Sequence, residues 1–179
     1  MVHSLHELIG DIISHNFPNY HILKDEAVGG DTKRLPMFPS YPKSRDKTYC
    51  NVDLLILKNE KIQVIIEIEE TDITPNKICG KFLTSALSSY FIHRDFNDDP
   101  ISMDDSVSFI QILDTSEIKD KSFKIKQGIN LESSIRKVLP IKDSKIRKYS
   151  LIYGNIFDFK DKNSDQSKKL NKCLEEALK

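Results

Sequence analysis

The sequence predicts an α/β fold in which a central mixed β-sheet is flanked by helices. Runs rich in Val, Ile and Leu, which are typical of strands, alternate along the chain with segments whose apolar residues recur at helical spacing. The predicted order through residue 113 is helix, strand, strand, strand, helix, strand. A mixed sheet covered by helices is the natural architecture for that order.

The N-terminal part of the chain predicts a helix over residues 5–15 and a strand over 20–28. Ser4 can cap the helix with Glu7 as its reciprocal partner, and the helix carries one apolar stripe. The strand carries Glu26 and stops at a pair of glycines. Glu26 is therefore a candidate for a site on the sheet, although strand ends also carry exposed glutamates that have no such role.

Residues 29–49 predict a long loop, because they contain three prolines, two leading glycines and many cations. Loops of this length inside a compact domain are usually functional. The whole chain has 27 basic and 27 acidic residues and no net charge, so no global positive field attracts nucleic acid. A solvated loop and a local phosphate-binding surface both fit the segment. Its cations are Lys33, Arg34, Lys43, Arg45 and Lys47.

Two apolar strands, predicted over residues 52–57 and 62–68, carry the most informative side chains. The carboxylates of Asp53, Glu67 and Glu69 interrupt their apolar pattern. An unpaired carboxylate inside a sheet is energetically costly, and carboxylates that persist there usually share a cation. Oxygen ligands of this kind suit Mg²⁺ or Mn²⁺. Acidic strand ends that merely face solvent are the alternative interpretation.

The turn between these strands decides whether the carboxylates meet. A loop over 59–61 makes the numbers of paired residues sum to 120 and places Asp53 opposite Glu67, with Cβ atoms about 4.5 to 5.5 Å apart. Glu69 then projects from the same face. A two-residue loop gives a sum of 119 and puts Asp53 and Glu67 on opposite faces. A shared metal therefore requires an odd-numbered loop or a bulge.

The remaining elements complete one domain over residues 1–179. Thr74 and Pro75 begin a helix that is expected to run to about Phe91. Further segments follow without a linker that would divide the chain. They are a strand over 106–113, a helix over 131–139, a strand over 149–156 and an amphipathic helix from about Ser164.

Residues 1–115 resemble the core of the PD-(D/E)XK nuclease superfamily, the restriction-endonuclease-like proteins, and residues 116–179 then form a C-terminal extension. That family has an αβββαβ core, with an acid at the start of the second strand and an acid-x-lysine or acid-x-acid motif on the third. Asp53 and Glu67-Ile68-Glu69 match these positions. The chain departs from the pattern in two places: Glu69 replaces the usual lysine, and Val52 replaces the proline before the first acid.

The resemblance implies that Asp53 and Glu67, with the backbone carbonyl of Ile68, hold Mg²⁺ or Mn²⁺, and that Glu26 is a further ligand. It also implies that Glu69 orients or deprotonates the attacking water, in the place of the family's lysine.

Lysines on the following helix are the alternative to Glu69 for the activation of water. Lys81, or Lys77 one turn earlier, can reach back to the carboxylates, although Lys81 also fits an ordinary helix-surface residue.

The resemblance further implies a nuclease that hydrolyses phosphodiester bonds in double-stranded DNA, in the manner of a type II restriction endonuclease. The cations of the 29–49 loop would then contact phosphates without reading sequence. Family members that cut both strands often work as homodimers. A catalytically inactive member of the fold, acting as a nucleic-acid-binding or protein-interaction module, is the alternative. A soluble α/β protein with structural acidic strand ends is a third interpretation.

Composition limits the remaining classes. No apolar run approaches the ~20 residues that span a bilayer, and the N-terminus lacks the layout of a signal peptide. The three cysteines show no metal-site or disulfide spacing. These features predict a cytoplasmic protein with reduced thiols.

Overall fold

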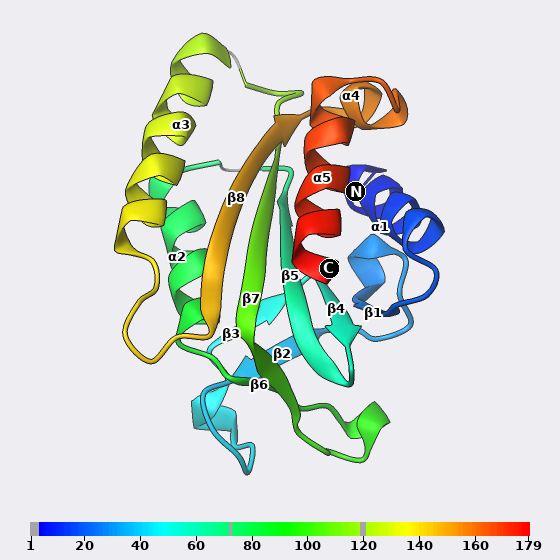
Figure 1. The fold of residues 1–179 in the computed structure, drawn as a ribbon, viewed down its shortest axis with the longest axis vertical. Helices are drawn as coiled ribbons and strands as arrows, with labels where there is room; N and C mark the ends of the chain where they lie inside the picture. Colours follow the sequence, from blue (N-terminus) through cyan, green and yellow to red (C-terminus); the bar gives the residue numbers. More distant parts are fainter. Residues whose placement is uncertain (1–3, 72, 119–120) are drawn as a thin grey trace.

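The computed structural model describes residues 4–71, 73–118 and 121–179. Within them, eight strands form one mixed sheet at the centre of the molecule (Figure 1). The strands are β1 His21–Lys24, β2 Leu35–Phe38, β3 Cys50–Val52, β4 Leu54–Lys58, β5 Lys61–Glu69, β6 Tyr90–Phe91, β7 Ile101–Asp114 and β8 Ile146–Gly154. The predicted α/β class with a central mixed sheet and flanking helices is confirmed.

The sheet has two parts that share the long strand β7. In the main part the strands lie in the order β1-β4-β5-β7-β8, with β5, β7 and β8 parallel and β1, β4 and β5 antiparallel. In the smaller part, β6, β2 and β3 extend from the first residues of β7 and pair antiparallel. The carboxyl ends of β5, β7 and β8 therefore lie at one edge, far from β6.

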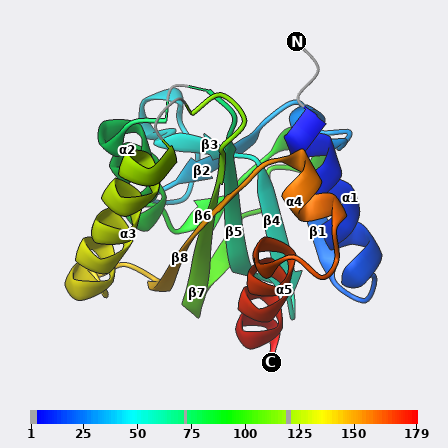
Figure 2. The same cartoon turned by 90° about the horizontal axis from the view of Figure 1, so that it is seen from above.

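Five helices cover the two faces of the sheet, as the view from above shows (Figure 2). On one face lie α2 and α3, and on the other lie α1, α4 and α5. The α-helices are α1 Ser4–Asn16, α2 Pro75–Ala86, α3 Lys121–Val138, α4 Ile156–Lys160 and α5 Asp165–Leu178, and the short 3₁₀ turns are η1 Glu26–Val28, η2 Arg45–Lys47 and η3 Arg94–Phe96.

Each face of the sheet buries its own hydrophobic core, because side chains alternate between the faces along each strand. On the α2 and α3 face, Ile65, Phe109 and Tyr149 pack around Phe82 of α2. On the other face, strand residues such as Ile66 pack against α1 and α5. A polar residue that points to either face of the central strands is therefore buried by default.

The α2 helix begins as predicted and ends earlier. The Thr74 hydroxyl caps it by accepting a hydrogen bond from the Lys77 amide, and Pro75 occupies the first turn. The helix ends at Ala86 rather than near Phe91, because Tyr90 and Phe91 pair with β7 and β2 as strand β6. This early end corrects the predicted helix boundary.

Residues 29–49 are not a single loop, which corrects a second expectation. They contain β2 and η2, and β2 joins β3 to β6 within the sheet. The sequence suggests a loop because Pro36 lies inside β2, where a proline weakens the strand pattern. The preceding strand is also shorter than predicted: β1 ends at Lys24, and Asp25 caps η1 through its side chain.

The predicted C-terminal elements are present with other bounds: α3 begins at Lys121 rather than near residue 131, and β8 spans Ile146–Gly154 rather than 149–156. Ile156, expected in the strand, instead begins the short helix α4, which was not predicted. Ser164 caps α5 by accepting a hydrogen bond from the Ser167 amide. No helix in the described part of the chain combines the length and the apolar character that a membrane crossing needs.

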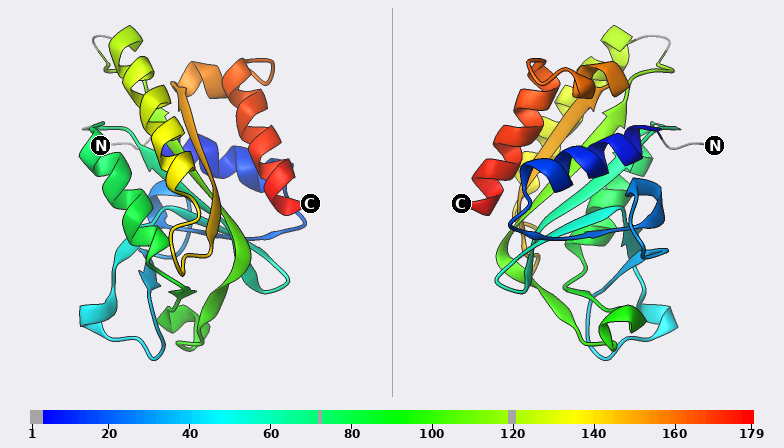
Figure 3. Two further views of the ribbon diagram at one scale, coloured as in Figure 1. Left: turned by 60° about the vertical axis from the view of Figure 1, so that its left-hand side comes forward. Right: turned by 90° about the vertical axis from the view of Figure 1, so that its right-hand side faces the viewer.

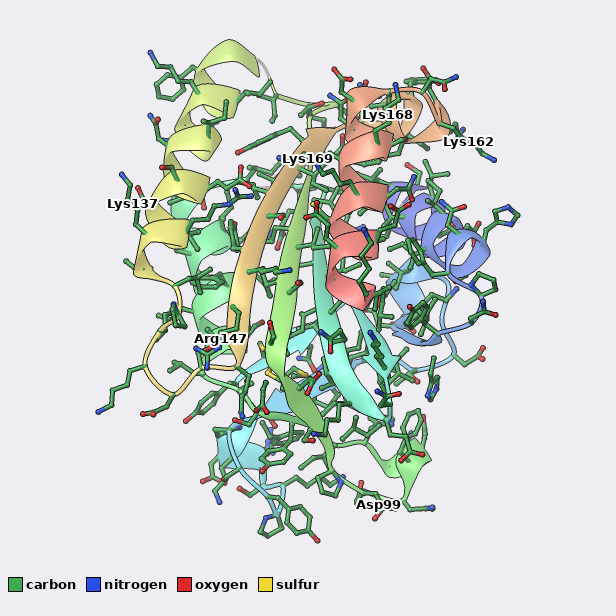
Figure 4. The ribbon with its side chains drawn as sticks, in the orientation of Figure 1. Asp99, Lys137, Arg147, Lys162, Lys168 and Lys169 are labelled. Atoms are coloured by element: carbon green, nitrogen blue, oxygen red, sulfur yellow. The ribbon has the colours of Figure 1, made fainter. Side chains whose placement is uncertain are left out.

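Side chains cover the open edge of β8. The Leu151 amide donates to Glu132 Oε1 at 3.0 Å, and Lys169 Nζ donates to the Leu151 carbonyl at 2.7 Å. Arg136 Nε donates to the Tyr149 carbonyl at 3.0 Å. Glu132 and Arg136 come from α3, and Lys169 reaches the strand from α5 (Figure 4). Backbone groups that an edge strand normally leaves open are thus bound.

Candidate active site

Asp53 lies at the point where the chain passes from the smaller part of the sheet to the main part. Strand β3 pairs with β2 and ends at Val52, whereas β4 begins at Leu54 and pairs with β1 and β5. The change of partner breaks the predicted single strand at Asp53, whose backbone carbonyl accepts a hydrogen bond from the Asp25 amide. The break frees the Asp53 side chain to approach the end of β5.

A β-bulge in the pairing of β4 with β5 gives the register in which Asp53 and Glu67 can come together. The turn has two residues, Asn59 and Glu60, with φ of 52° and 62°, as in a type I′ hairpin. A bulge then leaves Gln63 as an extra residue, and Leu54 pairs with Ile66. One step beyond that pair, Asp53 and Glu67 occupy facing positions.

The Asp53 side chain is bound to the acidic segment of β5. Its Oδ2 accepts a hydrogen bond from the Ile68 amide at 2.7 Å. Ile68 separates Glu67 from Glu69, so Asp53 contacts the backbone between the two motif glutamates. The structure therefore brings the three predicted acids to one end of the β4–β5 hairpin.

Glu67 and Glu69 both face helix α2, where two lysines meet them. Lys81 Nζ lies 2.6 Å from Glu67 Oε2 and 3.7 Å from Glu69 Oε1, and Lys77 Nζ lies 2.6 Å from Glu69 Oε2. Glu67 is fully buried and Glu69 is 3% exposed. Lys81 is thus part of the carboxylate cluster rather than an ordinary surface lysine.

Burial and neighbouring charge set the protonation of this pair. Burial, and then the charge of Asp53, hold the pKa of Glu67 well above its usual range, although Lys81 partly opposes the shift. For Lys81, burial acts to lower the pKa, but the charges of Glu67 and Asp53 outweigh it and raise the pKa above the usual value. Lys81 therefore remains an ammonium ion at neutral pH.

His6 of α1 forms the opposite wall of the site, and it is absent from the sequence-based candidates. Its Nδ1 lies 2.6 Å from Glu70 Oε1, and its Nε2 lies 3.7 Å from Asp53 Oδ2. Burial alone would lower the pKa of His6, but the hydrogen bonds with Asp53 and Glu70 raise it to about 8. The sequence does hold a signal, because His6 falls on the same helical face as Ile9 and Ile13.

Glu26 does not join the site, and its expected strand position is wrong. It is an exposed residue of η1. The neighbouring Asp25 is the acid whose pKa is affected by the charge of Asp53. Burial, and then the charge of Asp53, raise the pKa of Asp25 to about 6. The Asp25 Oδ1 atom accepts hydrogen bonds from the Ala27 and Val28 amides, so it serves as the cap of η1.

The acids open into a cleft of about 510 Å³ at the carboxyl ends of β5 and β7. Its wall combines the motif residues with the start of α1, the start of α2 and the segment after β7. The lining residues are Ser4, His6, Asp53, Ile68, Glu69, Glu70, Thr71, Lys77, Lys81, Asp114, Ser116 and Glu117.

The predicted phosphate-contacting cations fall into two groups. Lys33 and Arg34 are exposed at the start of β2, where Leu35 pairs with Val52 next to Asp53. The second group, Lys43, Arg45 and Lys47, lies around η2 at the lower end of the molecule, away from the N-terminus (Figure 3). In that group Lys43 is paired with Asp98. Neither group is among the described residues that line the cleft, but the first group lies close to Asp53 in the strand pairing.

Two observations bear on whether these acids can hold a divalent cation. Among the residues that the structure describes, no three His, Cys, Asp or Glu side chains are grouped closely enough to hold a metal ion. Yet Glu67 Oε1 and Glu69 Oε1 are both buried and have no hydrogen-bond partner in the described part. Buried carboxylate oxygens without partners are uncommon and fit an oxygen-seeking cation such as Mg²⁺.

Comparisons of the chain with models of protein families, with curated proteins and with solved structures find no match. The interpretation of the site therefore depends on the residues themselves and on their geometry.

Proposed function

We propose that this chain is a divalent-metal-dependent nuclease of the PD-(D/E)XK type that hydrolyses phosphodiester bonds, with DNA as its substrate. The observation that carries the proposal is the convergence of Asp53, Glu67 and Glu69 with Lys81 at one cleft. The cluster combines buried acids with a fixed ammonium group. Carboxylates of this kind suit a divalent cation, and the cation and the ammonium group together would stabilise the negative charge of a phosphodiester transition state.

Asp53, Glu67 and the backbone carbonyl of Ile68 are the groups that would hold Mg²⁺ or Mn²⁺. The Glu67 Oε1 and Glu69 Oε1 atoms, which accept no hydrogen bond among the described residues, support this assignment. When bound, the ion supplies Lewis-acid polarisation of the phosphate and a more acidic water molecule.

The side chains around the acids have separate roles in the proposal. Lys81, which stays protonated, donates hydrogen bonds to the phosphate and stabilises the negative charge that develops on it. A protonated lysine is not a base, so Glu69, whose Oε1 accepts no hydrogen bond in the described part of the chain, accepts the proton of the attacking water. His6 places a second positive charge on the opposite wall of the cleft.

Substrate binding is proposed to begin with Lys33 and Arg34, which lie close to Asp53 in the strand pairing. Cations of this kind position the phosphate backbone without reading base sequence. Double-stranded DNA remains the expected substrate, and cleavage of both strands would require two copies of the chain or two successive encounters.

The decisive experiment is cleavage of supercoiled and linear DNA with Mg²⁺ or Mn²⁺. We expect the wild-type protein to nick or cut the DNA, and Glu67→Gln to be inactive. A matched control is Glu60→Gln, which changes an exposed carboxylate on the turn of the same hairpin. Cleavage by Glu67→Gln at the wild-type rate would contradict the proposal, because it would indicate a contaminating nuclease or a different site.

A second function has one observation in its favour. Lys81 and Lys77 already neutralise the two glutamates, as in a nuclease fold that has lost its metal and serves as a nucleic-acid-binding or protein-interaction module. Calorimetry with Mn²⁺ separates the two functions. The nuclease should bind Mn²⁺ and lose that binding in Asp53→Asn. A module that binds DNA fragments without metal and never cleaves them would replace the nuclease proposal.

A further inference from the structure

A second buried polar pair lies beside the acidic cluster, on strand β7. Glu67 and Gln111 are direct partners in the parallel β5–β7 pairing, and both are fully buried. Neighbouring strands lie about 4.8 Å apart, and paired residues point to the same face. The Gln111 side chain therefore extends beside that of Glu67, within the core under α2.

The amide of Gln111 is oriented from the other side by Tyr149 of β8. The Tyr149 hydroxyl donates a hydrogen bond to Gln111 Oε1 at 2.7 Å. A phenol of raised pKa acts as the donor here, so the oxygen of the amide faces Tyr149 and the nitrogen is left for another partner.

Within the described part of the chain, the Gln111 nitrogen lacks a hydrogen-bond acceptor, and the neighbouring Glu67 has an oxygen that lacks a donor. Gln111 Nε2 is a buried donor, and Glu67 Oε1 is a buried acceptor, and neither has a hydrogen-bond partner among the described residues. A buried polar atom without a partner costs free energy that a single hydrogen bond recovers. An orphan donor and an orphan acceptor on paired residues of one sheet face can therefore satisfy each other.

We propose that Gln111 is a positioning residue for Glu67, with Nε2 donating to Glu67 Oε1 directly or through one buried water molecule. This inference extends the proposed nuclease function. The hydrogen bond uses one lone pair of Oε1 and fixes the rotation of the Glu67 carboxylate, so that Oε2 remains directed toward Lys81 and the second lone pair of Oε1 stays available to a metal ion. Outer groups that hold a ligand in this way commonly change metal affinity 10- to 100-fold when they are removed.

The inference can be tested without metal or DNA, through the side-chain amide signals of Gln111 in ¹⁵N–¹H spectra. We expect a Gln111 amide proton that is shifted downfield and exchanges slowly with water. Glu67→Gln should move this signal upfield, because a hydrogen bond to a neutral acceptor is weaker than one to a carboxylate. The side-chain amide of Gln63, which donates to the Ser106 carbonyl on the same sheet, is the internal reference and should not move.

A second arm measures Mn²⁺ affinity by calorimetry. Gln111→Met keeps the length of the side chain but removes the donor, and we expect Mn²⁺ to bind 10 to 100 times more weakly. Gln63→Met is the control and should bind like the wild type. Tyr149→Phe, which removes only the hydroxyl that orients Gln111, should weaken binding in the same direction and also serves if Gln111→Met does not fold.

The two arms separate the inference from the nuclease proposal. If the wild type binds no Mn²⁺, the nuclease proposal fails, and the amide spectra alone decide the role of Gln111. The inference would be overturned if the Gln111 amide signal lay at the position of a free glutamine and did not move in Glu67→Gln. Unchanged Mn²⁺ affinity in Gln111→Met would overturn it as well.

Discussion

The Asp53 carboxylate accepts a hydrogen bond from the Ile68 amide across the gap between β4 and β5, at 2.7 Å. This bond replaces the next backbone link of the antiparallel ladder, because the chain bends at Asp53 and the ladder ends at Leu54 and Ile66. One side chain therefore joins the two strands at the point where the site opens. Asp53 is both a structural link and a proposed metal ligand.

Two substitutions at Asp53 should separate these roles. Asp53→Asn keeps an oxygen that can accept the Ile68 hydrogen bond, so it should lose only the charge interactions of Asp53 with His6 and Lys81 and should destabilise the fold less than Asp53→Ala. Asp53→Ala leaves the amide without a partner and should lower the free energy of unfolding by about 1 to 3 kcal/mol. Both variants should lose Mn²⁺ binding and cleavage, measured by calorimetry and by a DNA assay. Equal stability of the two variants in urea unfolding would contradict the structural role.

The Lys81–Glu67 pair predicts a stability loss that depends on pH. Lys81→Met leaves Glu67 buried without its partner and should cost about 2 to 3 kcal/mol at neutral pH, the partial exposure of Lys81 reducing the effect. Because the folded-state pKa of Glu67 is raised, its penalty is absent at low pH and grows as the pH rises through that pKa. Acidification should therefore restore the variant toward wild-type stability.

Lys77→Met is the matched control for Lys81→Met. Lys77 is more exposed and pairs with Glu69, so its loss should cost about 1 kcal/mol or less. The double variant Lys81→Met with Glu67→Gln should recover most of the lost stability, because no uncompensated charge remains. Denaturant unfolding of the wild type, Lys81→Met, Glu67→Gln and the double variant gives the coupling directly.

His6 predicts a second dependence of stability on pH, over the range in which His6 loses its proton. Its pKa rises from 6.5 to about 8 on folding, so protonation of His6 stabilises the folded state. This contribution is complete below pH 6.5 and is lost as the pH rises through about 8; by linkage it amounts to about 2 kcal/mol. His6→Gln should remove that part of the pH dependence of the melting temperature. His15→Gln, an exposed histidine on the same helix, should leave it intact.

The two groups of cations predict different contributions to DNA binding. Replacement of Lys33 and Arg34 by glutamine should weaken DNA binding and lower cleavage, because these residues lie close to Asp53 in the strand pairing. Replacement of Arg45 and Lys47 should affect cleavage less. The dependence of affinity on salt concentration reports lost phosphate contacts, with a change in slope of about 0.9 for each contact. A larger loss from the η2 pair would place the DNA along the lower end of the molecule instead.

The sequence predicts the centre of the fold well because its signals there are local. The hairpin that carries Glu67, the cap of α2 at Thr74 and the cap of α5 at Ser164 all follow from short-range patterns. The possible convergence of Asp53 and Glu67 also follows from the sequence, through the requirement for an odd loop or a bulge. In the structure a bulge at Gln63 fulfils this requirement. Its presence is decided by how β4 and β5 pack together, and no local sequence pattern reveals it.

The missed features depend on contacts between distant segments. Strand β2 contains Pro36 and resembles a loop, and it becomes a strand only because β3 and β6 lie on either side of it. His6 reaches Glu70 across 64 positions of sequence. In each case tertiary packing overrides the local pattern.

The side chains that bind the backbone of β8 also determine how copies of this protein can meet. Glu132, Arg136 and Lys169 occupy the carbonyl and amide groups through which a foreign strand would extend the sheet. Fibrillar growth and dimers built by continuous sheet pairing are therefore disfavoured on this side. A homodimer would instead form through the helices or through the other edge of the main sheet, at β1. Glu132→Ala should accordingly promote self-association before it measurably lowers stability.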